Sequence, residues 1–276
     1  MTSRKIIDLI QKLFGMCGVG ITSKATLNHL IKTEEEYFAM QDRYAIDLHL
    51  ALSIKDAPSE KMLPLIASSE SQLHQDIFVL SILDFKKDGY FVEFGAASGR
   101  ELSNSYLLEK EFNWRGILAE PGKIWHQQLK ANRENAIIET RCVWKDSDST
   151  LTFNEVKSAE LSTIQEFSGS DGHIHARAGG VTYSVETISL LDLLDSHNAP
   201  RVIDYLSIDT EGSEYEILEA FDFAKYSFNV ITCEHNYTSN REKIYSLLTA
   251  HGYVRVHDQL SQFDDWYINA DLIPAS

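Results

Sequence analysis

Cysteine is scarce in this sequence, and the three cysteines lie far apart at positions 17, 142 and 233. An odd number at such spacing predicts neither a disulfide framework nor a CxxC metal site. Cys142 and Cys233 occur in apolar runs, where a free cysteine usually packs as a small hydrophobic residue. A reducing compartment is therefore expected.

Basic residues are also few. Lys and Arg number 25 against 41 Asp and Glu, so the formal net charge is −16 at pH 7. The sequence shows no cluster of Lys and Arg of the kind that contacts a nucleic-acid backbone, which argues against nucleic acid as the main partner. The same acidity argues against electrostatic attachment to anionic lipid.

A long apolar run is missing at the N-terminus, because Asp8, Gln11 and Lys12 interrupt it. This interruption argues against a signal peptide and against a transmembrane helix. The apolar residues fall on one helical face, which predicts a docking helix, with reversible membrane-surface association as the alternative. The residues of that face are Ile6, Leu9, Ile10, Leu13 and Phe14.

The part of the chain before residue 84 has helical periodicity. Apolar residues recur at helical spacing over residues 34–52 and 71–83, and the stretch 57–64, with two prolines, indicates a connector. We expect residues 1–73 to form an N-terminal helical extension and residues 74–276 to form an α/β domain.

From Tyr90 onward, short apolar runs alternate with helical segments, which predicts a parallel sheet covered by helices on both faces. Two tail strands would end this sheet with an antiparallel strand. Strands are expected at residues 90–95, 115–121, 136–144, 203–212, 228–236, 252–257 and 265–269, and helices at 104–112, 122–133, 188–196, 213–222 and 240–251.

The interval 145–187 breaks this rhythm. Residues 150–156 predict an edge or hairpin strand, and residues 162–185 are rich in Gly, Ser and His. Loops of this length are usually functional or mobile, so His173, His175 and Arg177 are candidates for a lid over an acceptor. The alternative is a solvated loop without contact to substrate.

The stretch FVEFGAASG, residues 91–99, describes a buried strand that ends in a glycine loop. Ligands of open α/β sheets bind beyond the carboxyl ends of the strands. Ala97 stands where a dinucleotide-binding GxGxxG motif has its second glycine, which disfavours a nicotinamide-dependent oxidoreductase. Glu120 ends the second strand, where it could accept hydrogen bonds from the two hydroxyls of a ribose.

This combination predicts an adenosyl ligand without phosphates, and S-adenosylmethionine meets that description. The alternative is that Gly95 and Gly99 only form a tight turn and that Glu120 is a solvated strand end, because glycine loops often occur without a ligand.

Beyond these single features, the sequence resembles the FkbM family of class I S-adenosylmethionine-dependent methyltransferases over about residues 74–269. The resemblance implies an α/β, Rossmann-like fold with a seven-stranded, mostly parallel sheet whose last strand is antiparallel. The segments that carry it are FVEFGAASG, LSNSYLLEK, WRGILAEP, LSIDTEGSEYEIL, EHN and FDDWY.

The resemblance also implies which residues meet the cofactor. Its methionine and ribose parts would be lined by Glu93, Phe94, Gly95, Ala96 and Gly99, and its amino-acid end would meet Ser103 and Asn104. The ribose hydroxyls would be held by Glu120, next to Pro121. The adenine would be bordered by Val143 and Trp144, at the end of the third strand. Trp144 as simple core packing is the alternative.

Acidic residues follow the fourth and fifth predicted strands, at the edge that carries the glycine loop. Methyl transfer to a hydroxyl needs a base or a metal ion, because an alcohol is a poor nucleophile near neutral pH. We expect Asp209, Glu211 and His235 to be catalytic. Asp209, Glu234 and His235 could hold Mg²⁺ or Mn²⁺, and sugar O-methyltransferases with metal-binding acids at equivalent strand ends are similar in arrangement.

Each of these residues also has a structural alternative. Glu211 and Glu214 could stabilise the N-terminus of the next helix, and His235 could be a hydrogen-bonded structural histidine. Trp266, in the segment FDDWY, could stack on a sugar or pack in the core.

The predicted function is S-adenosylmethionine-dependent O-methylation of a sugar, glycan or natural-product acceptor. The alternative is a non-catalytic, cofactor-binding subunit of a glycan assembly system, which the retained acids and His235 disfavour. The cytoplasm, where the cofactor is made, is the expected location. The N-terminal helices could supply a homo-oligomer interface.

Overall fold

The computed structural model describes residues 32–33, 37, 43–50, 52, 54 and 59–273. The helix predicted within residues 1–14 lies outside these residues, as does much of the helix predicted at 34–52, of which residues 43–50 are described and helical. The chain divides into two units, Met1–His49 and Leu50–Ser276, and the sheets and helices that follow belong to the second unit. The domain boundary after residue 73 stays a prediction.

Seven strands form the main sheet, in the order β10-β11-β9-β8-β1-β2-β3. All neighbouring pairs are parallel except those that β11 makes with β10 and β9. The predicted Rossmann-like sheet with one antiparallel strand is therefore confirmed. The strands are β1 (Tyr90–Phe94), β2 (Arg115–Ala119), β3 (Ile137–Glu139), β8 (Val202–Ile208), β9 (Ser227–Glu234), β10 (Tyr253–Val256) and β11 (Asp264–Asn269).

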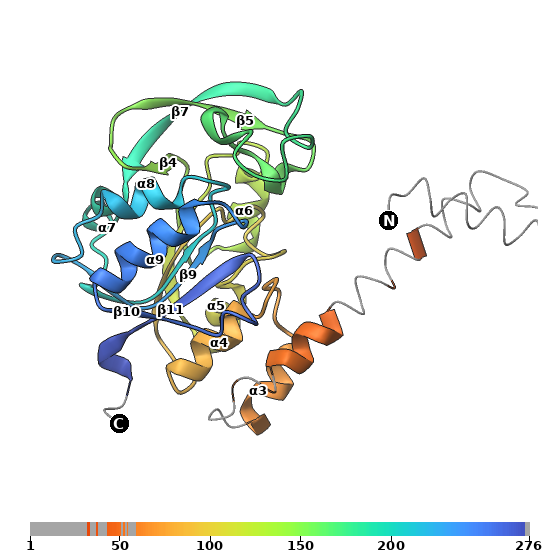
Figure 1. The fold of residues 1–276 in the computed structure, drawn as a ribbon, viewed down its shortest axis with the longest axis vertical. Helices are drawn as coiled ribbons and strands as arrows, with labels where there is room; N and C mark the ends of the chain where they lie inside the picture. Colours follow the sequence, from red (N-terminus) through yellow and green to blue (C-terminus); the bar gives the residue numbers. More distant parts are fainter. Residues whose placement is uncertain are drawn as a thin grey trace, which may run out of the picture. The chain divides into compact units, whose positions relative to one another are not determined.

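Apolar side chains on both sides of the central strands are buried, such as Phe91 and Leu118 and their neighbours Val92 and Ile117. Val92 and Ile117 belong to one core cluster with Leu193 and Leu248 from the covering helices. Figure 1 shows α8 and α9 next to each other against the sheet. The helices are α4 (Gln75–Ile82), α5 (Tyr106–Phe112), α6 (His126–Asn132), α7 (Leu190–Ser196), α8 (Glu214–Glu219) and α9 (Asn240–Ala250).

Two short elements differ from the prediction. The expected connector at residues 57–64 contains the start of helix α3 (Ser59–Ile66), which includes Pro64. The helix expected at 188–196 begins only at Leu190, because the Ser189 hydroxyl accepts a hydrogen bond from the Asp192 backbone N–H and caps the helix. Within the described residues, no helix is long and apolar enough to cross a membrane.

A second sheet of four strands, in the order β4-β7-β5-β6, was not predicted. The strand expected at 136–144 breaks into β3, in the main sheet, and β4 (Cys142–Trp144), in the second sheet. The segment expected to be a loop at 162–185 contains β6 (Thr163–Ile164) and the first half of β7 (Val181–Ser189), which pairs with β5 (Thr150–Glu155) over six residues. Figure 1 shows β5 and β7 at the top, beyond the main sheet.

Candidate active site

A cavity lies at the carboxyl ends of the main-sheet strands, between them and the second sheet. About 820 Å³ of space lies within it, a figure that includes the open solvent at its mouth. Of the predicted site residues, those that line it are Phe94, Gly95, Ala96, Ser103, Glu120, Pro121, Val143, Asp209 and Glu211.

Gly95 allows the ends of β1 and β8 to approach each other. Its φ is +70°, and a Cβ at this position would lie only 1.8 Å from the backbone oxygen of Asp209. No L-residue fits there without moving one of the two strand ends. Gly95 therefore places the glycine loop directly beside the acidic turn that follows β8.

Glu120 joins the glycine loop to the turn after β2. Its Oε2 accepts a hydrogen bond from the Ala97 backbone N–H at 2.8 Å, and its Oε1 accepts one from Gly122 N–H at 2.6 Å. Burial raises the pKa of Glu120 to about 7 in spite of these two bonds. Because a carboxylate has about four acceptor positions, two remain for donors from the cavity, and the hydroxyls of a ribose supply two such donors.

One wall of the cavity is apolar. Cys142, Val143, Phe153 and Ile164, all buried, line it from β4, β5 and β6 of the second sheet. A flat, apolar base such as adenine needs a wall of this kind, so the residues present fit an adenosyl group with Glu120 at its ribose. The sequence did not indicate that Phe153 and Ile164 line the site, because the second sheet was not predicted.

Several residues assigned to the cofactor by resemblance do not line the cavity. Gly99 has a φ of +74°, and a Cβ there would lie 2.5 Å from Cδ1 of Leu129, so this glycine serves the packing of α6. The carboxylate of Glu93 accepts hydrogen bonds from Asn104 N–H at 2.9 Å and from the Ser103 hydroxyl at 3.1 Å. Glu93 thus fixes the residues before α5 through hydrogen bonds and does not itself line the cavity.

Asn104 and Trp144 also belong to the interior. The Asn104 side-chain amide donates to the Ser207 hydroxyl at 3.0 Å. Trp144 belongs to the buried core cluster of the second sheet and packs edge-on against Phe167. Cofactor contact by Glu93, Gly99, Asn104 and Trp144 remains a prediction.

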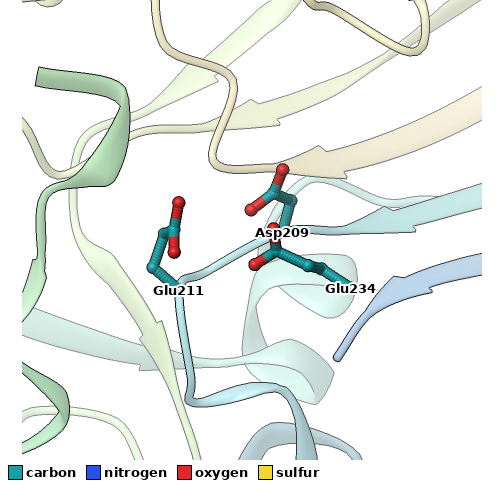
Figure 2. A group of neighbouring side chains, drawn as sticks. All are labelled: Asp209, Glu211 and Glu234. Carbon is teal, nitrogen blue, oxygen red and sulfur yellow. The ribbon is translucent and has the colours of Figure 1, made fainter. Parts of the chain in front are cut away.

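Three carboxyl groups, two from the turn after β8 and one from the end of β9, lie close together (Figure 2), and those of Asp209 and Glu211 line the cavity. One oxygen each of Asp209, Glu211 and Glu234 lies within 4.8 Å of the other two. Burial, followed by the charge of Glu214, raises the pKa of Asp209 to about 7. Burial and the neighbouring Asp209 raise the pKa of Glu211 against the opposing charge of Arg177, and burial with the same neighbour raises that of Glu234 well above its usual value.

His235 lies outside this group and does not line the cavity. Its Nδ1 accepts a hydrogen bond from Tyr237 N–H at 2.9 Å, and its Nε2 is 3.8 Å from Oδ1 of Asp265. Burial lowers the pKa of His235. The structure therefore brings Asp209 and Glu234 together with Glu211, whereas the predicted metal set joined them with His235.

The structural alternatives hold for two other residues. Glu214 Oε1 accepts hydrogen bonds from the N–H groups of Thr210 and Gly212, both at 3.0 Å, at the start of α8. Trp266 is fully buried and stacks on Phe78 with ring centroids 4.5 Å apart, so it belongs to the core.

Arg177 is the residue whose environment differs most from the expected loop. Its side chain is buried, and its Nη2 lies 2.5 Å from Oε2 of Glu211. His175, by contrast, is exposed. No periodic pattern in the sequence indicates that an arginine in a Gly/Ser-rich segment reaches an acid after β8.

Among solved structures, the chain is similar to precorrin-6y C5,15-methyltransferase from Geobacter metallireducens, at 15% identity and a TM-score of 0.38, over 70% of this chain and 84% of that one. It is also similar to a TehB-like SAM-dependent methyltransferase from Corynebacterium glutamicum, at 8% identity and a TM-score of 0.34, over 76% and 92% of the two chains. No curated protein matches the sequence.

The family profile of the methyltransferase FkbM domain matches residues 93–262. This range begins in β1, whose end forms the glycine loop, and extends past the acids of β8 and β9. Because it spans more than half of the 276 residues, the chain belongs to the FkbM methyltransferase family, whose methyl donor is S-adenosylmethionine.

Proposed function

We propose that the protein transfers the methyl group of S-adenosylmethionine to a hydroxyl of a sugar, glycan or natural-product acceptor. The observation that carries the proposal is a single cavity lined by Glu120 and an apolar wall together with Asp209 and Glu211. The first group of residues suits an adenosine, and the second suits a sulfonium and a hydroxyl whose proton must be removed.

Asp209 is the residue best suited to remove that proton. It lines the cavity, and its pKa of about 7 lies near neutral pH, where a general base works most effectively. As the hydroxyl oxygen bonds to the methyl carbon, the bond from that carbon to sulfur breaks with its electron pair left on sulfur. The hydroxyl proton passes to the Asp209 carboxylate, and the neutral thioether needs no acid to leave.

A divalent cation would fit the same acids. Asp209, Glu211 and Glu234 offer carboxylate oxygens within 4.8 Å of one another, and such oxygens are the preferred ligands of Mg²⁺ and Mn²⁺. An ion held there would lower the pKa of an acceptor hydroxyl. It would also offset the repulsion that raises the pKa values of these carboxyl groups.

The test is a transfer assay with methyl-labelled cofactor against free sugars, nucleotide sugars, glycan fragments and phenolic natural products. We expect an acceptor that gains one methyl group on oxygen, identified by mass spectrometry. The cytoplasm, where the cofactor is made, is the location that this activity implies.

Two variants make the assay specific. Asp209→Asn should lower the transfer rate at least about 100-fold while S-adenosylhomocysteine still binds in calorimetry. Asp195→Asn, which changes an exposed acid paired with Arg201, is the matched control and should transfer at the wild-type rate. Transfer by Asp209→Asn at the wild-type rate would refute the proposed base. Absence of cofactor binding by the wild type would refute both this function and the alternative of a non-catalytic, cofactor-binding subunit.

A further inference from the structure

The connection from β5 to β7, residues 156–180, borders the cavity, and we call it the strap. Ala159, Ser162 and Ile164 of the strap line the cavity together with the main-sheet residues. The strap therefore forms a wall of the site, and its position determines the shape of the space beside Asp209 and Glu211.

Two contacts attach the strap to the backbone of the acidic turn after β8. The Thr163 hydroxyl donates to the Glu211 carbonyl oxygen at 3.0 Å. The second contact is between Gly212, whose φ is +125°, and the strap residues Phe167 and Ser170. These residues pack so closely that a Cβ added to Gly212 would lie 3.1 Å from Cβ of Phe167 and 3.0 Å from the Ser170 hydroxyl oxygen. The strap and the turn are thus in direct contact.

Arg177 adds the only charged contact that the described structure shows between the strap and the carboxyl cluster. Its Nη1 and Nη2 donate to the two carboxylate oxygens of Asp171, at 2.9 and 3.0 Å, and its Nε donates to Leu161 O at 2.8 Å. Nη2 also donates to Glu211 Oε2 at 2.5 Å. One planar guanidinium therefore joins two parts of the strap to the site through three nitrogen atoms, whereas a lysine would have to reach the same acceptors from a single nitrogen.

Glu211 needs such support. Its φ of +60° lies in the left-handed region, which is unfavourable for a residue with a side chain. Its Oε2 receives hydrogen bonds from Arg177 and, at 3.2 Å, from the Asn236 side chain. The carboxylate is therefore held from the strap and from the segment after β9 at the same time.

We propose that Arg177 is a positioning residue of the methyl-transfer site. It fastens the strap to the turn that carries Asp209 and Glu211, and so fixes these carboxylates and the cavity wall relative to each other. Arg177 itself does not line the cavity, so it acts through Glu211 and the strap. This inference rests on the proposed function, which supplies the reaction that the residue supports.

The expected effect is on turnover more than on cofactor binding. The residues that suit the adenosine, Gly95 and Glu120, come from the ends of β1 and β2, which Arg177 does not contact. In Arg177→Gln, we expect kcat for the acceptor found in the transfer screen to fall about 100-fold, as small misplacement of reacting groups does. The dissociation constant of S-adenosylhomocysteine should change by less than about threefold.

The experiment combines these kinetics with amide hydrogen exchange of the cofactor-free protein, followed by mass spectrometry. In Arg177→Gln, peptides from residues 156–180 should exchange at least about tenfold faster, while peptides from β1 and β8 keep their protection. Arg177→Lys, which keeps the charge but loses the planar fork, should recover part of kcat. Arg201→Gln removes an exposed arginine paired with Asp195 and should match the wild type in every measurement.

Thr163→Val provides a milder test in case Arg177→Gln does not fold. It removes the hydroxyl bond to Glu211 O at nearly constant volume, and we expect strap exchange to rise by about twofold to tenfold. Unchanged strap exchange in Arg177→Gln, or a kcat equal to the wild type, would overturn the proposal. Parallel loss of kcat, cofactor affinity and sheet protection would also overturn it, because it would show a general structural role.

The exchange measurement needs neither cofactor nor acceptor. If the wild type binds no S-adenosylhomocysteine, the proposed function fails and the positioning role fails with it, whereas the contact between strap and turn is judged by exchange alone. A wild type that binds and transfers, with an Arg177→Gln variant that does so equally well, refutes only the positioning role.

Discussion

At the scale of single residues, Glu120 is the group that most directly connects sequence to cofactor. It is buried and accepts two backbone hydrogen bonds, and none of the residues that line the cavity with it is basic. A carboxylate in this position is costly to bury unless further donors complete its hydrogen bonds. The hydroxyls of a ribose would supply those donors.

Replacing Glu120 by Gln should therefore weaken the binding of S-adenosylhomocysteine. The amide loses the charge and one acceptor oxygen, and two hydrogen bonds to a charged group account for an affinity loss of about 10- to 100-fold in calorimetry. The matched control is Glu139→Gln, at the end of β3, whose carboxylate pairs with Arg141 outside the cavity. Equal affinity for both variants would remove Glu120 from the cofactor site.

The carboxyl cluster leads to a separate prediction about metal ions. If Asp209, Glu211 and Glu234 hold Mg²⁺ or Mn²⁺, transfer should stop after treatment with EDTA and return when either ion is added. Elemental analysis must confirm that the treated protein contains no metal. Full activity of that metal-free protein would show that transfer needs no ion at these acids.

At the scale of elements, periodicity predicted the main sheet well. Buried runs such as YFVEF and VIDYLSI are β1 and β8, and helical spacing located α4 to α6, α8 and α9 within a few residues. The second sheet was missed because its strands are short or lie within polar sequence. β7 includes Thr182, Ser184 and Glu186, and it becomes a strand through its pairing with β5 and β4.

The site residues on the main sheet were predicted, whereas those on the second sheet were not. Residues at strand ends of the main sheet, such as Gly95, Glu120 and Asp209, lie at the cavity because parallel strands end at a common edge. Phe153 and Ile164 could not be predicted, since they depend on the second sheet. Arg177 depends on a contact 34 positions away in the sequence, which no local pattern contains.

Substitution of Gly99, with Gly252 as the control, tests whether Gly99 serves the packing of α6 or the binding of the cofactor. Gly99 and Gly252 have φ values of +74° and +84°, but only at Gly99 would a Cβ collide, 2.5 Å from Cδ1 of Leu129, whereas nothing lies within 4 Å at Gly252. Both changes to Ala should cost about 1–2 kcal/mol in backbone strain. Gly99→Ala should cost about 1–3 kcal/mol more from overpacking of α6.

Urea unfolding of the two variants measures these free energies. Cofactor affinity should follow the stability of Gly99→Ala only weakly, because Gly99 does not line the cavity. Equal destabilisation by the two substitutions would mean that α6 tolerates the added methyl group. A selective loss of cofactor affinity in Gly99→Ala would restore Gly99 to the cofactor site.

At the scale of the whole molecule, buried acids make the stability depend on pH. Burial raises the pKa values of Glu120 and Asp209 to about 7 and that of Asp264 to about 8, from ordinary values of 4.5, 3.8 and 3.8. Between the ordinary and the raised values, the folded protein binds more protons than the unfolded chain does. The free energy of unfolding therefore falls as pH rises through this range.

We expect the cofactor-free protein to lose stability progressively from about pH 5 to about pH 8, as measured by urea unfolding at each pH. The formal net charge of −16 acts in the same direction, because repulsion grows as more acids ionise. Stability that rises over this interval would contradict the raised pKa values, because it would show that the acids are ionised and paired in the folded protein.

The assignment of Glu120 and the Gly95 turn to the cofactor is tested most directly by a crystal structure of the protein with S-adenosylhomocysteine. We expect the ribose hydroxyls within about 3.2 Å of the Glu120 carboxylate oxygens, the adenine against the apolar wall of the second sheet, and the sulfur toward Asp209. Cofactor bound away from both Glu120 and the Gly95 turn would refute the assignment.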